Sequence, residues 1–210
     1  MFWDNVAWVY DVFAYVINRK ANKRLCDLIG GMITPSDNVL ECACGTGMLS
    51  EVIAAKCKSL TATDFSEKML ERAERKNREY RNVKFEKADI TQLGYADEAF
   101  DVVVAANVIH LLDDPYRALR ELDRVCRGGG RIIIPTYMNR TKKGDTNKVT
   151  GAIAKAGADF KREFTAESYK EFIAGAGYEN VSYAFCDGRI PCSVAVIHKS
   201  DKTMKGSALK

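Results

Sequence analysis

A glycine turn between an apolar run and a helical pattern is the first stretch of this sequence that could do chemistry. The run 39–44 has the apolar character of a buried strand, and Gly45-Thr46-Gly47 follows it directly. From Met48 onward the apolar residues recur with helical spacing. A strand, a glycine turn and a helix open a nucleotide-binding unit, because glycines let a ligand approach the backbone and the helix offers unpaired N–H groups.

A carboxylate follows this turn at a distance that suits the same chemistry. Asp64 ends the next apolar run, 59–63, close to the spacing of about 20 residues at which an acidic group binds the ribose hydroxyls of a nucleotide. A glycine pair alone is weak evidence, because many turns between strands and helices carry glycine for steric reasons. Together, the turn and the acid predict a site for a ribose-containing ligand.

Size and composition favour one ordinary globular domain. The chain has 210 residues, of which 47% are hydrophobic and 29% are charged. It contains no apolar run of about 18 residues, so we expect no transmembrane helix, and its first residues lack the pattern of a signal peptide. Among the seven cysteines, Cys42 and Cys44 fall in a predicted buried strand, which indicates reduced core thiols and a cytoplasmic location. Paired C-x-x-C spacings are absent, so we expect no metal site.

Alternating strand and helix patterns position the glycine turn. We expect helical structure over 6–28, 47–56, 66–78, 115–126 and 165–174, and strands over 39–44, 59–63, 83–87, 100–106, 132–134, 181–186 and 192–199. Ser66 and Thr165 are predicted N-caps, and the glycines at 30–31 and 128–130 are predicted to end the segments before them. Asp187-Gly188 predicts a turn between the last two strands, which should form an antiparallel hairpin. This pattern predicts an α/β fold with a mostly parallel, doubly wound sheet.

Three segments lie outside this alternation. We expect a single domain over 1–210, in which 1–35 forms an N-terminal helical cover and 200–210 a flexible tail. Segment 137–164 interrupts the alternation and is predicted to be a lid insertion. It carries the basic residues Arg140, Lys142, Lys143, Lys148, Lys155, Lys161 and Arg162. These charges fit either a solvated surface or one that attracts an anionic substrate or a lipid headgroup.

Several motifs in this frame resemble those of a known family. The stretch 39–47 is similar to the first motif of the class I S-adenosylmethionine-dependent methyltransferases, 63–66 to the acidic second motif, and 87–90 to the residues that bracket the adenine. The stretch 100–137 is similar over its whole length, and Tyr10-Asp11 resembles a pair found near the start of these enzymes. The likeness is to the small-molecule group that includes the ubiquinone and menaquinone biosynthesis methyltransferases. Ala43 stands where the family usually has its first glycine, and Cys126-Arg127 replaces a common Lys-Pro.

The resemblance implies a fold, a cofactor and a set of binding residues. The fold would be a Rossmann-like, seven-stranded sheet with helices on both faces, with strand order 3-2-1-4-5-7-6 in chain numbering and the seventh strand antiparallel. The cofactor would be S-adenosyl-L-methionine, with S-adenosyl-L-homocysteine as product. The cofactor-binding residues would be Tyr10, Glu41, Ala43, Cys44, Gly45, Thr46, Gly47, Asp64, Phe65, Met69, Asp89, Ile90 and Asn107.

Individual roles follow from the same resemblance. Asp64 would accept bonds from both ribose hydroxyls, and Asp89 would meet the exocyclic amine of the adenine. The adenine ring would lie among three apolar side chains, those of Phe65, Met69 and Ile90. At the other end, Glu41 would lie near the ammonium group, beside the glycine-turn backbone.

The acceptor is predicted to be a small molecule that attacks the methyl carbon in line through an O, N, C or S atom. A base is needed only where the acceptor must lose a proton, and His110, just after Asn107, is the candidate. A packing role for this histidine remains equally open. Tyr10, His110 and Tyr137 are the candidate acceptor-binding residues. The acceptor could be anionic or lipid-like, and the sequence leaves monomer and homodimer open.

Two other enzyme classes would need residues that this sequence lacks. A nicotinamide-dependent oxidoreductase would carry a third glycine where Ser50 stands. A nucleic-acid methyltransferase would carry D-P-P-Y at the end of a strand, whereas the stretch 113–116 lacks the second proline and starts a predicted helix. We therefore expect no nucleic-acid partner. A non-catalytic protein that binds S-adenosylmethionine stays open as an alternative.

Overall fold

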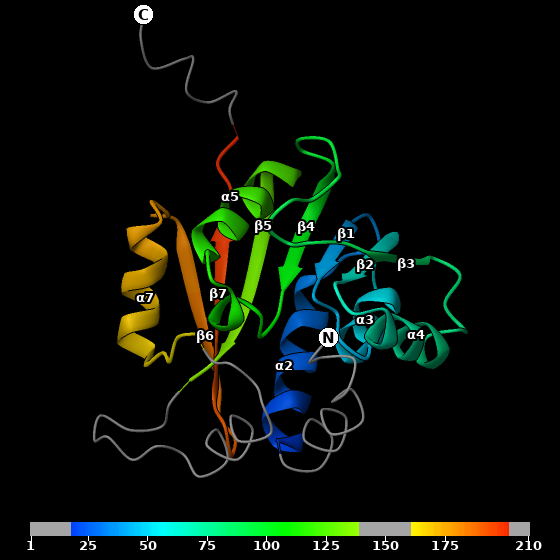
Figure 1. Ribbon diagram of the computed structural model, residues 1–210, viewed down its shortest axis with the longest axis horizontal. Helices are drawn as coiled ribbons and strands as arrows, with labels where there is room; N and C mark the ends of the chain where they lie inside the picture. Colours follow the sequence, from blue (N-terminus) through cyan, green and yellow to red (C-terminus); the bar gives the residue numbers. More distant parts are fainter. Residues whose placement is uncertain (1–17, 139–160, 202–210) are drawn as a thin grey trace, which may run out of the picture.

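The computed structural model describes residues 18–138 and 161–201, which contain a seven-stranded sheet (Figure 1). The strands lie in the order β3-β2-β1-β4-β5-β7-β6. Neighbours from β3 to β5 are parallel, whereas β7 is antiparallel to both β5 and β6. The predicted strand order and the antiparallel seventh strand are therefore confirmed. The strands are β1 (Asn38–Cys42), β2 (Ser59–Asp64), β3 (Val83–Lys87), β4 (Phe100–Ala105), β5 (Cys126–Tyr137), β6 (Val181–Cys186) and β7 (Cys192–His198).

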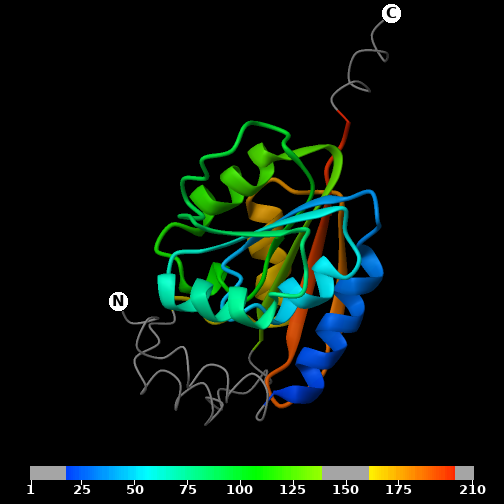
Figure 2. The same ribbon diagram turned by 90° about the vertical axis from the view of Figure 1, so that its right-hand side faces the viewer.

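Helices cover both faces of the sheet (Figure 2). The helices α2 (Arg19–Met32), α3 (Met48–Ala54) and α4 (Glu67–Lys76) share an apolar core with one face, through residues such as Val102 and Ile133. On the other face, α5 (Pro115–Val125) and α7 (Ala166–Gly175) pack with Leu40, Val103 and Ile132. A short 3₁₀ turn, η2 (Ile109–Leu111), follows β4. The apolar strands are buried on both sides, which is why they read as continuous hydrophobic runs.

Local sequence signals set several element boundaries as predicted. The Ser66 side chain accepts a hydrogen bond from the Met69 N–H at 3.3 Å at the start of α4. Thr165 accepts one from the Ser168 N–H at 3.1 Å, which with the reciprocal bond forms a capping box on α7. The residues around Asp187-Gly188 connect β6 to β7 in the expected antiparallel hairpin.

The glycines at 128–130 do not end a helix, so that prediction was wrong. α5 ends at Val125, and β5 begins at Cys126 and runs through all three glycines. The register with β4 shifts here, because Phe100 pairs with Cys126 and Val102 pairs with Arg131. A Cβ on Gly130 would lie 2.7 Å from the Asp101 carbonyl oxygen. The glycine therefore permits β5 to approach β4 closely.

The glycine pair at 30–31 was also misread as an ending, because α2 continues to Met32. A Cβ on Gly30 would lie 2.8 Å from Val52 Cγ1 on α3, whereas nothing lies within 4 Å of a Cβ on Gly31. Gly30 thus lets α2 pack closely on α3 in the last turn of α2. Sequence spacing shows a glycine, but it does not show that a neighbouring helix requires it.

Some predictions fall on residues outside the described ranges. These are most of the helical cover before residue 18, including Tyr10, most of the expected lid and nearly all of the expected tail. In the described ranges, no helix has both the length and the apolar character needed to cross a membrane. The seven cysteines are free, and all except Cys26 are buried.

The contrast between the two helical glycines gives a stability prediction. Gly31→Ala should raise the free energy of unfolding by about 1 kcal/mol, because alanine favours the helix and the site is open. Gly30→Ala should give a protein less stable than Gly31→Ala, since its new methyl group would overlap Val52. Urea unfolding of the two variants and the wild type measures this. Equal stabilisation by both substitutions would contradict the close packing of α2 on α3.

Candidate functional site

The turn after β1 has an unusual backbone. Ala43, Gly45 and Gly47 all have positive φ, at 55°, 56° and 82°. Left-handed backbone costs a residue with a Cβ about 1 kcal/mol, so Ala43 holds a conformation that favours glycine. This explains physically why the resembling family usually has glycine at that position. The site keeps the conformation because hydrogen bonds hold the turn on several sides.

Asp64 is one of the groups that hold it. Its Oδ2 accepts a hydrogen bond from the Gly45 N–H at 2.9 Å, and its Oδ1 accepts one from the Ser66 N–H at 2.9 Å. One carboxylate therefore links the end of β2 to the glycine turn and to the start of α4.

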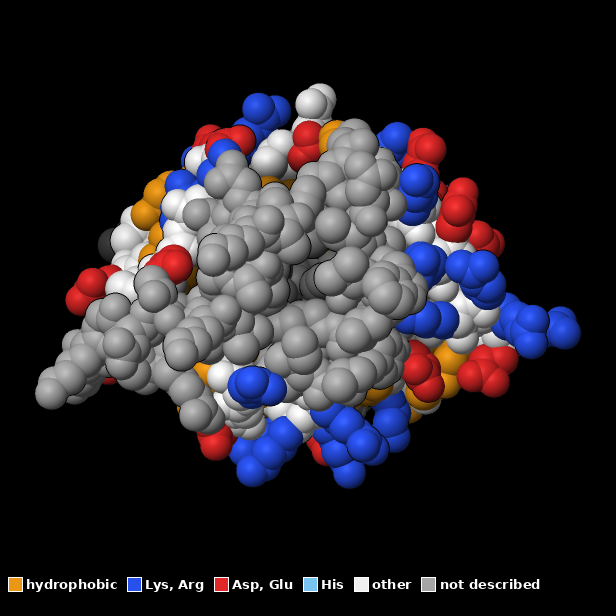
Figure 3. All heavy atoms as spheres, turned by 60° about the horizontal axis from the view of Figure 1, so that its bottom comes forward, with side chains coloured by type: hydrophobic (Ala, Val, Ile, Leu, Met, Phe, Trp, Pro, Cys, Tyr) orange, Lys and Arg blue, Asp and Glu red, His pale blue; other side chains and the backbone are white. Residues whose placement is uncertain are grey.

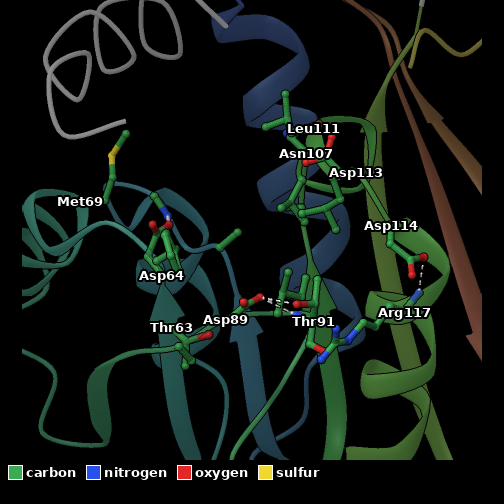
Figure 4. A pocket seen from close by; sticks show the side chains of 18 residues that line it. Thr63, Asp64, Met69, Asp89, Thr91, Asn107, Leu111, Asp113, Asp114 and Arg117 are labelled. Carbon is green, nitrogen blue, oxygen red and sulfur yellow. Dashed lines mark hydrogen bonds between the residues drawn. The ribbon is translucent and has the colours of Figure 1, made fainter. Parts of the chain in front are cut away.

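A cavity of about 500 Å³ opens beside this carboxylate, at the carboxyl edge of β1 to β4 (Figure 4). Figure 4 shows Asp64 and Met69 on one side of it and Asn107 across from them, with Asp89 and Thr91 lower in the view. Among the predicted cofactor residues, Ala43, Gly45, Asp64, Phe65, Met69, Asp89, Ile90 and Asn107 line the cavity. These residues lie at or beyond the ends of β1, β2, β3 and β4, which the parallel sheet brings to the same edge.

The remaining predicted residues lie elsewhere. Glu41, Cys44 and Thr46 are buried around the turn, and neither they nor Gly47 contribute to the cavity lining. His110 and Tyr137 are also absent from the lining; their ring centroids are 6.2 Å apart. Tyr10 lies outside the described ranges.

Glu41 is buried beneath the glycine turn and is only 2% exposed. Burial raises the pKa of its carboxyl group to about 8, although the Ser50 hydroxyl, which donates to Oε2 at 2.6 Å, acts in the opposite direction. The side chain is therefore mostly protonated at neutral pH in the free protein.

His110 is also buried, and burial lowers the pKa of its imidazole to about 4. The ring is neutral at physiological pH and is a weak base, since an efficient general base has a pKa near the working pH. Its backbone carbonyl accepts a hydrogen bond from the Arg162 N–H at 3.2 Å. The Arg162 guanidinium also donates to the carbonyl oxygens of Leu112 and Asp113, so it holds one wall of the cavity.

Sequence reasoning missed the cavity wall formed by the loop after β4 and the start of α5. The missed lining residues there include Leu111, Leu112, Asp113, Asp114 and Arg117. Thr91, in the loop after β3, was also missed. Arg117 Nε donates to the Thr91 carbonyl at 2.9 Å, and its N–H donates to the capping Asp114 side chain at 2.9 Å. The sequence signal was the helix start at Pro115, since Arg117 lies in that first turn.

The region that forms this site is similar to known proteins. Residues 40–134 match the model of a family described as a methyltransferase domain. The ubiquinone/menaquinone biosynthesis C-methyltransferase of Bdellovibrio bacteriovorus is 42% identical over 101 residues, which cover 47% of this chain and 43% of that protein. Over this region the chain is similar to S-adenosylmethionine-dependent methyltransferases.

Two further relatives extend the comparison. The phosphatidylethanolamine N-methyltransferase of Cereibacter sphaeroides is 38% identical over 107 residues, or 50% of this chain and 52% of that protein. The matched region thus spans about half the length of these two curated relatives. A solved S-adenosylmethionine-dependent methyltransferase from Thermotoga maritima has the same fold, with a TM-score of 0.72, 22% identity, and coverage of 95% of this chain and 99% of that one.

S-adenosylmethionine is the cofactor that the sequence motifs predict, and the cavity fits its chemistry. Carboxylates at the ends of β2 and β3 are available to hydroxyl and amine donors, because Asp64 and Asp89 both line the cavity. Apolar side chains of Phe65, Met69 and Ile90 line the same space and suit an aromatic base. Phe65 is 49% exposed, so its ring is accessible to a ligand in this cavity.

The protonated state of Glu41 gives a pH-dependent prediction. The pKa of this group is 4.5 in its ordinary state and about 8 in the fold, so its stabilising effect is full below pH 4.5 and is lost as the pH rises through about 8. Glu41→Gln keeps an acceptor for Ser50 and removes this loss. The variant should gain stability relative to wild type between about pH 5.5 and about pH 8.5 in urea unfolding. Exposed Glu74→Gln serves as the control; a stability difference for Glu41→Gln that is the same at both pH values would contradict the buried, protonated carboxyl.

Proposed function

We propose that this chain transfers a methyl group from S-adenosylmethionine to a small-molecule acceptor. The observation that carries the proposal is the convergence of two carboxylates, from the ends of β2 and β3, on one cavity beside the left-handed glycine turn. Ligands of open α/β sheets bind at this edge. The likeness of residues 40–134 to a methyltransferase domain supports the same function.

In this proposal, the adenosine half of the cofactor binds between β2 and β3. Asp64 accepts bonds from the ribose hydroxyls while it keeps its two backbone bonds, and charge-assisted bonds of this kind are strong. Asp89 meets the adenine amine. Its Oδ1 accepts bonds from the Thr91 N–H and hydroxyl, both at 2.8 Å, which hold the carboxylate in one orientation.

The methionine half then rests on the glycine turn. Gly45 lines the cavity with its bare backbone, and Ala43 contributes only a methyl group. The other turn residues, Cys44, Thr46 and Gly47, do not line the cavity. The Cys44 N–H donates to the Thr63 carbonyl at 2.9 Å, which ties the turn to β2. Glu41 lies below, and a cationic ammonium group nearby would favour its ionised form.

The bound cofactor supplies a methyl group that is already activated by its sulfonium. The chain's own task is to hold that group and an acceptor atom in line, and such alignment supplies several kcal/mol. Asn107, with φ of 53°, follows the end of β4 and lines the cavity, and its N–H donates to the Pro135 carbonyl at 2.8 Å. We assign His110 a packing role, because its ring is buried and weakly basic. Tyr137, whose ring lies beside that of His110, is assigned the same role.

We propose an anionic or lipid-like acceptor. The relatives named above act on quinone precursors or on a phospholipid, by their names. The first turns of α2 carry four exposed basic side chains, Arg19, Lys20, Lys23 and Arg24. They lie at the carboxyl edge of the sheet, because Asn18 bonds with Ile190 in the turn before β7. Figure 3 shows Lys and Arg side chains gathered along the lower margin of that side of the molecule.

The remaining assignments follow from the described residues. The buried, free cysteines suit a reducing compartment, so we propose that the chain acts in the cytoplasm. Asp114 caps α5, so the D-P-Y stretch starts a helix and supports no base-methylation motif. This argues against a nucleic-acid substrate.

Loss of the ribose-binding carboxylate should weaken cofactor binding. Asp64→Ala should raise the dissociation constant of S-adenosylhomocysteine at least about tenfold in calorimetry, since a charge-assisted bond is lost. Asp101→Ala is the matched control, because Asp101 Oδ2 accepts from the Asn38 N–H at 2.7 Å at the opposite edge of the sheet. Equal affinities for Asp64→Ala and wild type would count against the proposed site.

Methyl transfer itself can be tested without knowing the acceptor. The purified protein with S-adenosylmethionine labelled on its methyl group should label a small organic-soluble product in a cell extract. The Asp64→Ala variant should label at least about tenfold less, in line with its weaker binding. Binding of the cofactor with no labelled product from lipid, quinone and amine fractions would favour a non-catalytic binding protein. Label in nucleic acid would contradict the proposed acceptor class.

A further inference from the structure

A buried side-chain amide joins the end of α4 to the glycine turn. Asn77 follows the last residue of α4 and is 1% exposed. Its Nδ2 donates to the Ala73 carbonyl at 2.9 Å and to the Gly47 carbonyl at 3.2 Å. The first bond closes the helix, and the second crosses to the loop between β1 and α3. One side chain therefore holds carbonyl groups from two elements.

Gly47 fits tightly against the end of this helix. A Cβ on Gly47 would lie 2.5 Å from Asn77 Nδ2 and 3.0 Å from both Cα and Cβ of Ala73. With its φ of 82°, the residue is left-handed, and its carbonyl also accepts from the Glu51 N–H at 3.3 Å in the first turn of α3. The conformation of the glycine turn is therefore set by α4 as well as by the flanking strand.

The amide at this position has a cost that a purely structural residue would avoid. Asn77 Oδ1 is buried and has no hydrogen-bond partner within residues 18–138 and 161–201. A buried acceptor without a partner costs free energy, whereas an apolar side chain of similar size would avoid that cost. The bonds made by Nδ2 thus account for an amide here better than packing does.

α4 touches both halves of the proposed cofactor site. At its start, Phe65 and Met69 line the cavity where adenine is proposed to bind. At its end, Ala73 and Asn77 contact the glycine turn. Leu70 and Ala73 anchor the helix in the core between these two ends. The start of the helix therefore borders the proposed adenine site, and its end contacts the glycine turn.

We infer that Asn77 is a positioning residue for the methionine half of the cofactor: its amide fixes the Gly47 carbonyl and so the backbone on which that half rests. This inference rests on the proposed function. It extends that function by assigning to the end of α4 a role in recognising the amino-acid part of the ligand. Asn77 itself is absent from the cavity lining and acts through Gly47.

Two ligands that differ only in the amino-acid part test this. S-adenosylhomocysteine carries that part, and methylthioadenosine lacks it while keeping the adenosine and the sulfur. In calorimetry, Asn77→Ala should weaken S-adenosylhomocysteine about tenfold or more and change methylthioadenosine by no more than about twofold. Thermal unfolding of each variant establishes that it is folded; if Asn77→Ala does not fold, Asn77→Leu fills the space and tests the same bonds.

Asn82→Ala is the matched control. Asn82 Nδ2 also donates to two carbonyls at a helix end, those of Ala54 at 2.9 Å and Cys57 at 3.2 Å, but it does not reach the glycine turn. This variant should bind both ligands as wild type does. Equal weakening of both ligands by the Asn77 substitution, or no weakening of either, would overturn the inference alone. Failure of the wild type to bind either ligand would overturn the proposed function, and the inference with it.

Discussion

The close approach of α4 to the turn after β1 is the constraint on which the rest of the site depends. Gly47 has no room for a side chain between this turn and Ala73, and its left-handed backbone starts α3. At Gly45, the same turn exposes its bare backbone to the cavity. Because β1 lies between β2 and β4, this turn is adjacent to the ends of both. Any shift of the turn would move the cavity floor relative to the carboxylates.

Asp64 shows how one residue combines structure with recognition. Its two oxygens accept backbone bonds from Gly45 and Ser66, which join β2, the glycine turn and α4. The same carboxylate lines the cavity. A ligand that bonds to it therefore contacts a group already held in place, so little side-chain entropy is lost on binding. The structural and functional interpretations of this residue, which compete when only the sequence is considered, are compatible.

The sequence was most informative where a signal is local. The caps at Ser66 and Thr165, the bounds of β3 and β6 and the hairpin turn all follow from residues a few positions apart. The strand order followed from the resemblance to a family, because periodicity alone leaves the order of parallel strands open. Glycine was the main source of error. The glycines at 30 and 130 permit close packing against distant residues, and in the sequence they looked like endings.

The candidate site was predicted in the same uneven way. Residues just after strand ends, such as Asp64, Asp89 and Asn107, were found because parallel strands bring their ends together. Arg117 and Asn77 were missed, since each acts through a partner about 26 or 30 positions away in the sequence. His110 follows Asn107 closely, yet the short turn η2 buries its ring. Proximity in sequence to a strand end therefore does not ensure that a side chain reaches the cavity.

A crystal structure with S-adenosylhomocysteine is the most direct measurement of where the cofactor binds. We expect the ribose hydroxyls within hydrogen-bond distance of Asp64, the adenine beside Phe65 and Ile90, and the amino-acid part against the backbone at Gly45. A ligand bound away from the carboxyl edge of β1 to β4, or one bound there with its ribose turned away from Asp64, would contradict this site.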